Sequence, residues 1–242
     1  MNRSRILFVT AGIAATIAPA AVACADIVEF YGGDFDGRNA VGNYTVTNAS
    51  NVLVTDQRVY DDFAHSSTLS IAALFGNFLT NDAARTATAG YAFEIRSGVS
   101  SGNGGTLVAS GSSSSGFSWT ATGRTGFGFQ EYRFDANIPD LNLAAGTYHL
   151  NIRPLITAPA GVNMFLSTTS GANGVGSPLN NSNAFLTYAG GSFAPMATVF
   201  GAYDFSQGVT LVPLPAALAA GLPALLGIGV LAVRRRRLAR GL

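Results

Sequence analysis

Closely spaced acidic residues near the start of the chain could bind a hard cation. Asp34 and Asp36 precede Gly37 in the stretch YGGDFDGRN. Oxygen atoms of alternate side chains can converge on calcium, although the later bidentate glutamate of a helix–loop–helix site is missing. Asp61 and Asp62, in VYDDF, would complete such a site if the fold brought them near. The sequence therefore suggests a calcium site at Asp34 and Asp36, with an ordinary acidic turn as the alternative.

Few residues of the chain are suited to catalysis. His65 and His149 are the only histidines, and His149 is expected on the solvated face of a strand. A Ser-His-Asp triad around His65 is conceivable because its members need only meet in space, but the chain has no G-x-S-x-G or H-E-x-x-H motif. Glu94 and Glu131 could form the carboxylate pair of a glycosidase, yet both are expected on solvated faces. We therefore expect no enzymatic activity, with a hydrolase of unrecognised site as an alternative.

Aromatic side chains are the residues most suited to binding sugar rings. Trp119, Phe127 and Tyr132 lie in the middle of the chain, and large aromatic residues of a β-sandwich more often pack in its core. A row of exposed aromatic rings on one sheet face would favour a carbohydrate-binding module. The segment Gly126-Phe127-Gly128 is interpreted as a turn, because a phosphate-binding glycine loop opens a helix after a strand.

The segments that must position these residues have the pattern of β-strands. Apolar and polar residues alternate in GYAFEIRSG and in GTYHLNIRP, which is the period of a half-buried strand. Short strands joined by Gly-, Ser- and Asn-rich loops predict an all-β fold, a single antiparallel, jelly-roll-like β-sandwich. We expect six side chains to point inward: Tyr91, Phe93, Ile95, Tyr148, Leu150 and Ile152.

Further strands are expected where short apolar runs lie between turn-forming residues. A longer run at 67–79 could be a bent strand, with a β-bulge at Gly76. The remaining expected strands are 106–111, 117–123, 127–135, 164–168, 184–188 and 208–212.

The charge of the central part differs from that of the whole chain. The chain has 14 arginines, no lysine and 13 acidic residues, for a net charge of +1. Seven arginines lie near the two ends, so the centre holds the other seven and all 13 acidic residues, a net charge of about −6. No basic patch indicates nucleic-acid binding. The only cysteine is Cys24, so an exported domain without it must be stabilised by a sizeable core.

The N-terminal segment has the organisation of a secretory signal peptide. Two arginines precede an apolar stretch that ends in small residues. Ala23 and Ala25 fit the A-x-A cleavage pattern, which would leave Asp26 as the new N-terminus. Lipidation at Cys24 is the alternative, but such signals usually carry a large aliphatic residue three positions earlier, where this chain has alanine. We therefore expect export through the Sec translocon and cleavage by signal peptidase after residues 1–25.

The C-terminal segment has the organisation of a membrane span. Residues 216–233 form an uncharged run of eighteen residues, and a helix of that length spans about 27 Å, close to the roughly 30 Å of a bilayer core. A cluster of arginines follows and would hold the C-terminal end in the cytoplasm. A buried helix with a charged end is the alternative. These stop-transfer residues are Arg234, Arg235, Arg236 and Arg237.

The segment preceding this span contains two prolines and is expected to be extended. Its order of a proline motif, an apolar span and an arginine cluster resembles the PEP-CTERM sorting signal, in its VPLPA variant, of exopolysaccharide-producing Gram-negative bacteria. The segments YGGDFDG, VYDDF and LNLAAGTYHLNIRP also resemble members of this family, in which no activity is assigned to the pattern. The motif residues are Val212, Pro213, Leu214 and Pro215.

This resemblance implies a route for the protein and no reaction. In that family the signal is recognised by exosortase, a membrane-embedded cysteine peptidase, and is cut near the proline motif. An inner-membrane intermediate would therefore precede delivery to the cell surface or the extracellular matrix, where the chain would associate with exopolysaccharide in a biofilm. A secreted carbohydrate- or calcium-binding module is the second interpretation. The expected parts are a signal peptide at 1–25, an ectodomain at 26–211 and a sorting signal at 212–242, with its motif at 212–215, span at 216–233 and arginine cluster at 234–237.

Overall fold

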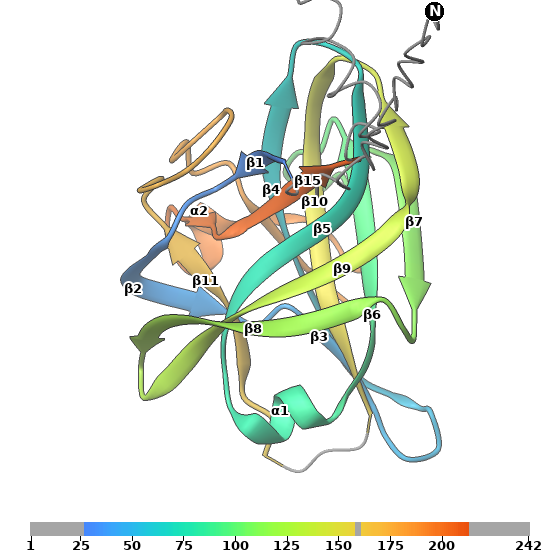
Figure 1. Ribbon diagram of the computed structural model, residues 1–242, viewed down its shortest axis with the longest axis vertical. Coiled ribbons are helices and arrows are strands. Elements are labelled where there is room, and N and C mark those ends of the chain that lie inside the picture. Colours follow the sequence, from blue (N-terminus) through green and yellow to red (C-terminus); the bar gives the residue numbers. More distant parts are fainter. Residues whose placement is uncertain (1–26, 158–160, 213–242) are drawn as a thin grey trace, which may run out of the picture. The chain divides into compact units, whose positions relative to one another are not determined.

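The computed structural model describes residues 27–157 and 161–212 (Figure 1). They belong to one compact unit that spans Asp26–Pro213. The expected signal-peptide site and the sorting signal from Pro213 onward lie outside the described residues. Within the described ranges, no helix is long and apolar enough to cross a membrane.

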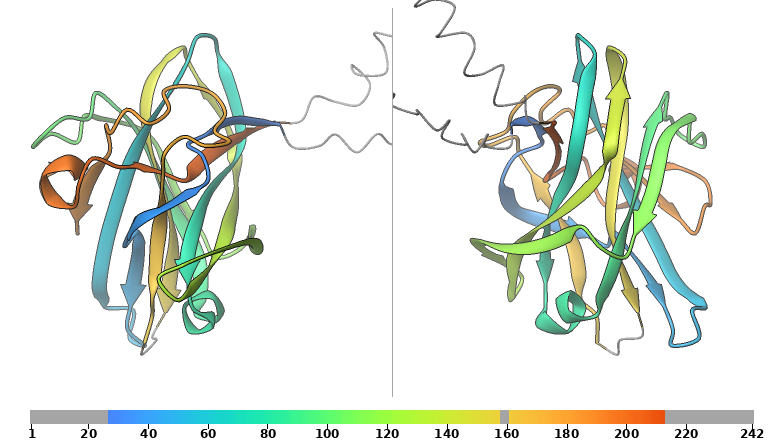
Figure 2. Two further views of the ribbon diagram at one scale, coloured as in Figure 1. Left: turned by 90° about the vertical axis from the view of Figure 1, so that its left-hand side faces the viewer. Right: turned by 45° about the vertical axis from the view of Figure 1, so that its right-hand side comes forward.

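The described residues form an all-β fold with two sheets. The sheets are curled rather than flat, as the course of β5 and β9 in Figures 1 and 2 shows. The first sheet has eight strands, in which β1, β15, β5, β11 and β14 follow one another, β2 pairs with β11, and β9 connects β5 to β8. Its strands are β1 (Val28–Tyr31), β2 (Phe35–Val41), β5 (Leu69–Thr80), β8 (Phe117–Gly126), β9 (Phe129–Leu143), β11 (Met164–Thr169), β14 (Asp204–Phe205) and β15 (Gln207–Leu211).

The second sheet has seven strands in the order β13-β12-β4-β3-β10-β6-β7, with an additional pairing of β4 with β10. All described pairings in both sheets are antiparallel except that of β3 with β10, which is parallel. The expectation of a wholly antiparallel fold is therefore wrong at this one pair. The strands are β3 (Tyr44–Thr47), β4 (Leu53–His65), β6 (Thr88–Ser97), β7 (Thr106–Ser113), β10 (Gly146–Thr157), β12 (Phe185–Tyr188) and β13 (Ala194–Pro195).

Two short helices occur among the described residues, and the first connects the two sheets. Helix α1 (Asp82–Thr86) follows β5 and precedes β6, and α2 (Met196–Val199) follows β13. The side chain of Asn81 caps α1 by accepting a hydrogen bond from the backbone N–H of Ala84 at 3.0 Å. Such a cap satisfies an N–H group that has no partner inside the helix.

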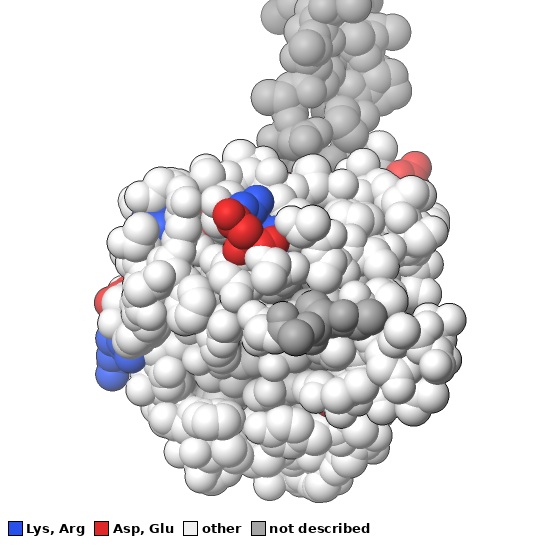
Figure 3. Space-filling model, turned by 90° about the horizontal axis from the view of Figure 1, so that it is seen from below, with Lys and Arg blue, Asp and Glu red and all other residues white. Residues whose placement is uncertain are grey.

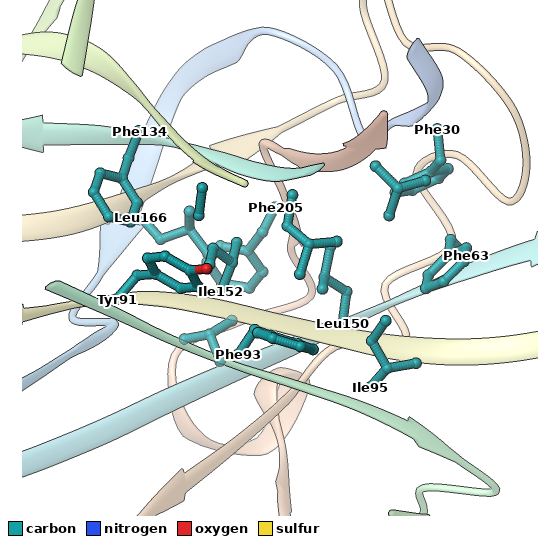
Figure 4. Close-up of a cluster of buried hydrophobic side chains, with 14 of the residues drawn as sticks. Phe30, Phe63, Tyr91, Phe93, Ile95, Phe134, Leu150, Ile152, Leu166 and Phe205 are labelled. Atoms are coloured by element: carbon teal, nitrogen blue, oxygen red, sulfur yellow. The ribbon is translucent and has the colours of Figure 1, made fainter. Parts of the chain in front are cut away.

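The predicted inward face of β6 and β10 is confirmed by the core, although residues on the other face of these strands are buried as well. All six side chains expected to point inward are buried, with Ile95, Leu150 and Ile152 fully so. They pack in one cluster with Phe134 and Leu166 of the eight-stranded sheet (Figure 4). Full burial of an aliphatic side chain stabilises a fold by about 1.5–3 kcal/mol, so this cluster holds the two sheets together.

Gly76 does not form a bulge. It pairs regularly with Phe134 on one side and Gln207 on the other, and the irregularity of β5 lies between Ile71 and Ala73. A Cβ atom at Gly76 would lie 2.9 Å from the ring of Phe78. The glycine is therefore explained by close packing against an aromatic ring, which is the other common reason for glycine inside a strand.

The second face of the seven-stranded sheet is also covered in part. Tyr60, Val99, Phe185 and Phe193 form a separate buried cluster, here called the outer cluster. The rings of Tyr60 and Phe193 are 5.0 Å apart. Polar residues that alternate with core residues in β4, β6 and β10 therefore face a second packed layer instead of water.

Candidate functional site

The carboxylate of Asp34 is held by three neighbours. Oδ1 accepts a hydrogen bond from the hydroxyl of Tyr31 at 2.7 Å and lies 2.8 Å from Arg124 Nη1, and Oδ2 accepts from Asn173 Nδ2 at 2.9 Å. Burial raises the pKa of Asp34, but the hydrogen bonds from Asn173 and Tyr31 and the charge of Arg124 outweigh it and lower the pKa overall. The ionised carboxylate is therefore already neutralised by an arginine.

The four acidic residues considered for calcium do not converge. Asp36 Oδ1 accepts from the hydroxyl of Thr168 at 2.6 Å and from the backbone N–H of Arg38 at 2.9 Å. Across residues 27–157 and 161–212, no three His, Cys, Asp or Glu side chains are grouped to hold a metal ion. Asp61 and Asp62 thus do not complete a site with Asp34, and calcium there would compete with Arg124.

Asp61 and Asp62 belong to β4 and instead lie near Asp204 and His149. These four residues are here called the acidic cluster. His149 lies directly opposite Asp62 in the pairing of β10 with β4. Asp61 Oδ2 accepts the backbone N–H of Phe205 at 2.6 Å, next to Asp204. Burial raises the pKa of both Asp61 and Asp204, and repulsion between the two carboxylates raises the pKa of Asp61 further. This cluster is buried, acidic and without an arginine partner among the described residues.

His149 is not solvated, so the sequence expectation for it is wrong. Its side chain is 4% exposed and its ring packs 5.4 Å from that of Phe185. Burial lowers the pKa of His149, partly offset by attraction to Asp62. The ring that packs on His149 belongs to Phe185, more than 30 positions later in the chain, so the sequence of β10 alone could not reveal it.

His65 is engaged by the neighbouring backbone. Its Nδ1 lies 2.5 Å from the backbone carbonyl oxygen of Ser67, so this nitrogen must carry the proton and donate it. Its ring stacks on Tyr148 at 5.5 Å. Among the described residues, no serine hydroxyl or carboxylate forms a hydrogen bond with His65.

Glu94 is buried within a network of arginines, so its expected solvation is also wrong. Its carboxylate lies 2.5 Å from Arg58 Nη1 and 2.8 Å from Arg96 Nε, and accepts the hydroxyl of Tyr60 at 2.8 Å. Burial raises the pKa of Glu94, but the hydrogen bonds from Tyr60 and Arg96 and the two arginine charges lower it overall. The group is therefore held ionised as a structural ion pair.

Glu131 is fully buried, again contrary to expectation. Its Oε2 lies 2.5 Å from Arg124 Nε and accepts the hydroxyl of Thr122 at 2.8 Å. Glu131 belongs to β9 of the eight-stranded sheet, whereas Glu94 belongs to β6 of the seven-stranded sheet. The two carboxylates thus serve separate ion pairs and do not form the catalytic pair of a glycosidase.

The three aromatic residues considered for sugar binding have different surroundings. Trp119 packs against the core, with its ring 4.6 Å from that of Phe134. Tyr132 is partly buried beneath Arg85, whose guanidinium carbon is 3.8 Å from the ring centre. Phe127 alone is largely exposed, at 61%. They do not form a row of exposed rings, and Trp119, which is partly buried, packs against the core.

Phe127 lies at the tip of the hairpin between β8 and β9. Its φ of 53° and that of Gly128, 81°, are both positive, which matches the two-residue hairpin turn that favours Asn-Gly. The rings of Phe35 and Phe127 are 6.1 Å apart. A shallow hollow of about 230 Å³ lies nearby, lined by Asn39, Ala40, Phe127, Phe129 and Phe165.

A larger cleft, which the sequence did not predict, opens between β7 and β9. Its volume is about 600 Å³, which is in the usual range for ligand sites. The hydroxyl of Tyr91 donates to the backbone carbonyl oxygen of Asn137 and so links β6 to β9. The cleft is lined by Tyr91, Phe93, Ala109, Ser110, Gly111, Ser112, Ser113, Ser115, Gly116, Asn137, Pro139, Asp140 and Leu141.

Charged residues are sparse in the chain, at 11% of its length. Charged atoms occupy only small areas of the face shown in Figure 3. No protein-family model matches the chain, and the search of curated proteins found no match.

Proposed function

We propose that this chain is an exported, non-catalytic surface or matrix protein of a Gram-negative bacterium, sorted and cleaved by exosortase. The observation that carries the proposal is the order at the C-terminus: Val212 to Pro215, then the apolar run at 216–233, then Arg234 to Arg237. A plain membrane anchor needs only the span and the charges, and it leaves the proline motif unexplained.

The position of this motif relative to the domain supports the proposal. Strand β15 ends at Leu211, and the backbone N–H of Val212 donates to the carbonyl oxygen of Ser70 at 3.0 Å. The last strand is therefore complete at the residue where the motif begins. Cleavage at or after Pro213 would release the domain with its sheet intact.

The fold also suits a binding or structural role. We propose that residues 26–211 are a jelly-roll-like β-sandwich, because side chains of both sheets share one core. The residues best suited to catalysis already have structural partners. His65 contacts the backbone carbonyl of Ser67, Glu94 pairs with arginines, and Glu131 pairs with Arg124. This arrangement favours association with exopolysaccharide over hydrolysis.

Two variants test the sorting proposal in the producing cell. Replacing Pro213 and Pro215 with alanine leaves apolar length and charge unchanged, so insertion should persist while release is blocked. The full-length chain should then accumulate in the inner membrane, as should the wild-type chain in cells lacking exosortase. Replacing Arg234 to Arg237 with serine should instead weaken retention and orientation. Normal release of the proline variant would overturn the proposal.

A further inference from the structure

We propose that the cleft between β7 and β9 binds a neutral saccharide chain. This inference deepens the proposed association with exopolysaccharide and rests on that function only for the source of the ligand. The cleft is defined by the thirteen lining residues given above.

The floor of the cleft is apolar and is kept open by small residues on β7. Tyr91 and Phe93 of β6 lie beneath it and are almost fully buried. Ala109 and Gly111 face them from β7, and a Cβ atom at Gly111 would lie 2.6 Å from the ring of Phe93. A larger residue at Gly111 would therefore displace that ring. Small residues here leave space where a sandwich would otherwise place aliphatic side chains.

The rim of the cleft offers hydrogen-bonding groups that the fold does not use. The side chains of Asn137 and Asp140 are exposed and form no hydrogen bond or ion pair with other described residues. The hydroxyl of Ser115 lies at the same rim, 3.5 Å from that of Ser113. Amide, carboxylate and hydroxyl groups together both donate and accept. A sugar ring carries hydroxyl groups at its edge and C–H groups on its faces, and so matches a polar rim above an apolar floor.

The charges of the lining select a neutral ligand. Among the described residues that line the cleft, Asp140 is the only charged one, and none is an arginine or a histidine. A uronic acid or another acidic sugar would place its charge near Asp140 without a cation to compensate, and like charges at an interface are unfavourable. A purely apolar ligand would remove Asn137 and Asp140 from water without replacing their hydrogen bonds.

A second hollow adjoins the cleft. The two together would accommodate a saccharide of several units better than a single sugar. A groove of about 480 Å³ shares Ser112 and Ser113 with the cleft. None of its nine described lining residues is charged, and six of them carry hydroxyl groups. The groove is lined by Thr45, Thr47, Ala89, Ser112, Ser113, Ser114, Leu155, Ile156 and Thr157. A chain of several sugars could therefore cross β7 from one hollow to the other.

The competing occupant is a strand from a second protein chain. β7 is the last strand of the seven-stranded sheet, and an edge strand can pair with another chain. Leu107 and Val108 are 48% and 41% exposed on it. Hydroxyl groups line both the cleft and the groove, and Asn137 and Asp140 line the cleft as well, which favours the saccharide.

Calorimetric titration of the full chain, purified in detergent, tests the proposal. The probes are neutral hexasaccharides of glucose, galactose and mannose, and a galacturonate hexasaccharide of equal length. We expect at least one neutral probe to bind at least tenfold more tightly than the acidic one. Failure of every neutral probe to bind at millimolar concentration, or tighter binding of the acidic probe, would overturn the proposal.

Substitutions then locate the binding. Ser115→Trp should fill the mouth of the cleft and weaken binding at least tenfold, whereas the control Ser101→Trp, in the exposed turn before β7, should leave it unchanged. Asn137→Ala should weaken binding about three- to tenfold, the value of one hydrogen bond. Equal binding by Ser115→Trp and wild type, with unchanged melting temperatures, would contradict the assignment, as would concentration-dependent dimers that close the cleft. Binding is measured without any sorting step, so its failure leaves the sorting proposal standing.

Discussion

The backbone N–H of Leu211 donates a hydrogen bond of 2.9 Å to the carbonyl oxygen of Ile27. This bond adjoins the antiparallel pairing of β1 with β15. Ile27 lies two residues after the expected signal-peptidase site, and Leu211 immediately precedes the proline motif. Ile27 and Leu211, near the two ends of the described domain, are therefore neighbours in space.

Removal of β15 should abolish the fold. β15 lies between β1 and β5, and Gln207 and Val209 are fully buried. A chain of residues 26–206 should therefore show no cooperative thermal unfolding, whereas residues 26–212 should unfold cooperatively. Calorimetry of both chains checks this. A cooperative transition in the shorter chain would mean that β15 is dispensable.

The shared core should be sensitive to truncation of its side chains. Leu150 is fully buried between the sheets, and Leu107 is 48% exposed. Leu150→Ala should lower the free energy of unfolding by about 2–5 kcal/mol, because it leaves a cavity. Leu107→Ala should change it by less than about 0.5 kcal/mol. Urea unfolding measures both, and similar values for the two would contradict the assigned core.

Replacing Arg124 should lower the free energy of unfolding far more than replacing Arg133. Arg124→Met leaves the fully buried Glu131 without its cation, so we expect a loss of about 3–5 kcal/mol. Arg133→Met breaks a partly exposed pair with Asp135 and should cost less than about 1 kcal/mol. Adding Glu131→Gln to Arg124→Met should restore part of the stability. Equal unfolding midpoints for the two single variants would argue against a buried ion pair.

The acidic cluster should make the folded state less stable at neutral pH than at low pH. The pKa of Asp204 is raised, chiefly by burial. Its contribution to stability is therefore present below the unfolded pKa of about 3.9 and is lost as pH rises through the folded pKa, at up to about 1.4 kcal/mol per pH unit. Asp204→Asn should thus become increasingly more stable than wild type between pH 4 and pH 7.

Thermal unfolding across that pH range checks this expectation. The difference between wild type and Asp204→Asn removes effects that other titrating groups exert on both chains. Asp140→Asn, at an exposed position outside the cluster, serves as the control substitution. A constant difference in melting temperature between wild type and Asp204→Asn from pH 4 to pH 7 would show that Asp204 is not held at a raised pKa.

The sequence predicted one face of β6 and β10 and several further strands, whereas the four strands β1 to β4, within residues 28–65, were not predicted. The period of two in GYAFEIRSG and GTYHLNIRP placed six side chains in the core, and all six are buried. It could not show what covers the opposite face, because alternation gives the same pattern whether polar residues meet water or an ion-pair network. Glu94 and His149 were misassigned for this reason.

The cleft between β7 and β9 could not be predicted from the sequence, for a related reason. Its floor comes from β6, its walls from β7 and β9, and the segments that form it are separated by up to about 50 positions. Small residues such as Ala109 and Gly111 do not by themselves indicate a cleft, because small residues are also common in turns and loops. Only the pairing of the strands reveals that Gly111 lies opposite Phe93 and Ala109 opposite Ile95.

The masses of the mature chain, recovered from cells with and without exosortase, test the central claim most directly. Intact mass spectrometry of the cell-surface and inner-membrane fractions reports both termini at once. With exosortase, the account predicts a surface form that starts at Asp26 and lacks residues 216–242; without it, a membrane form that starts at Asp26 and retains Arg234 to Arg237. Recovery of the chain from the inner membrane with its arginines attached in both strains would contradict sorting and leave an ordinary single-pass anchor.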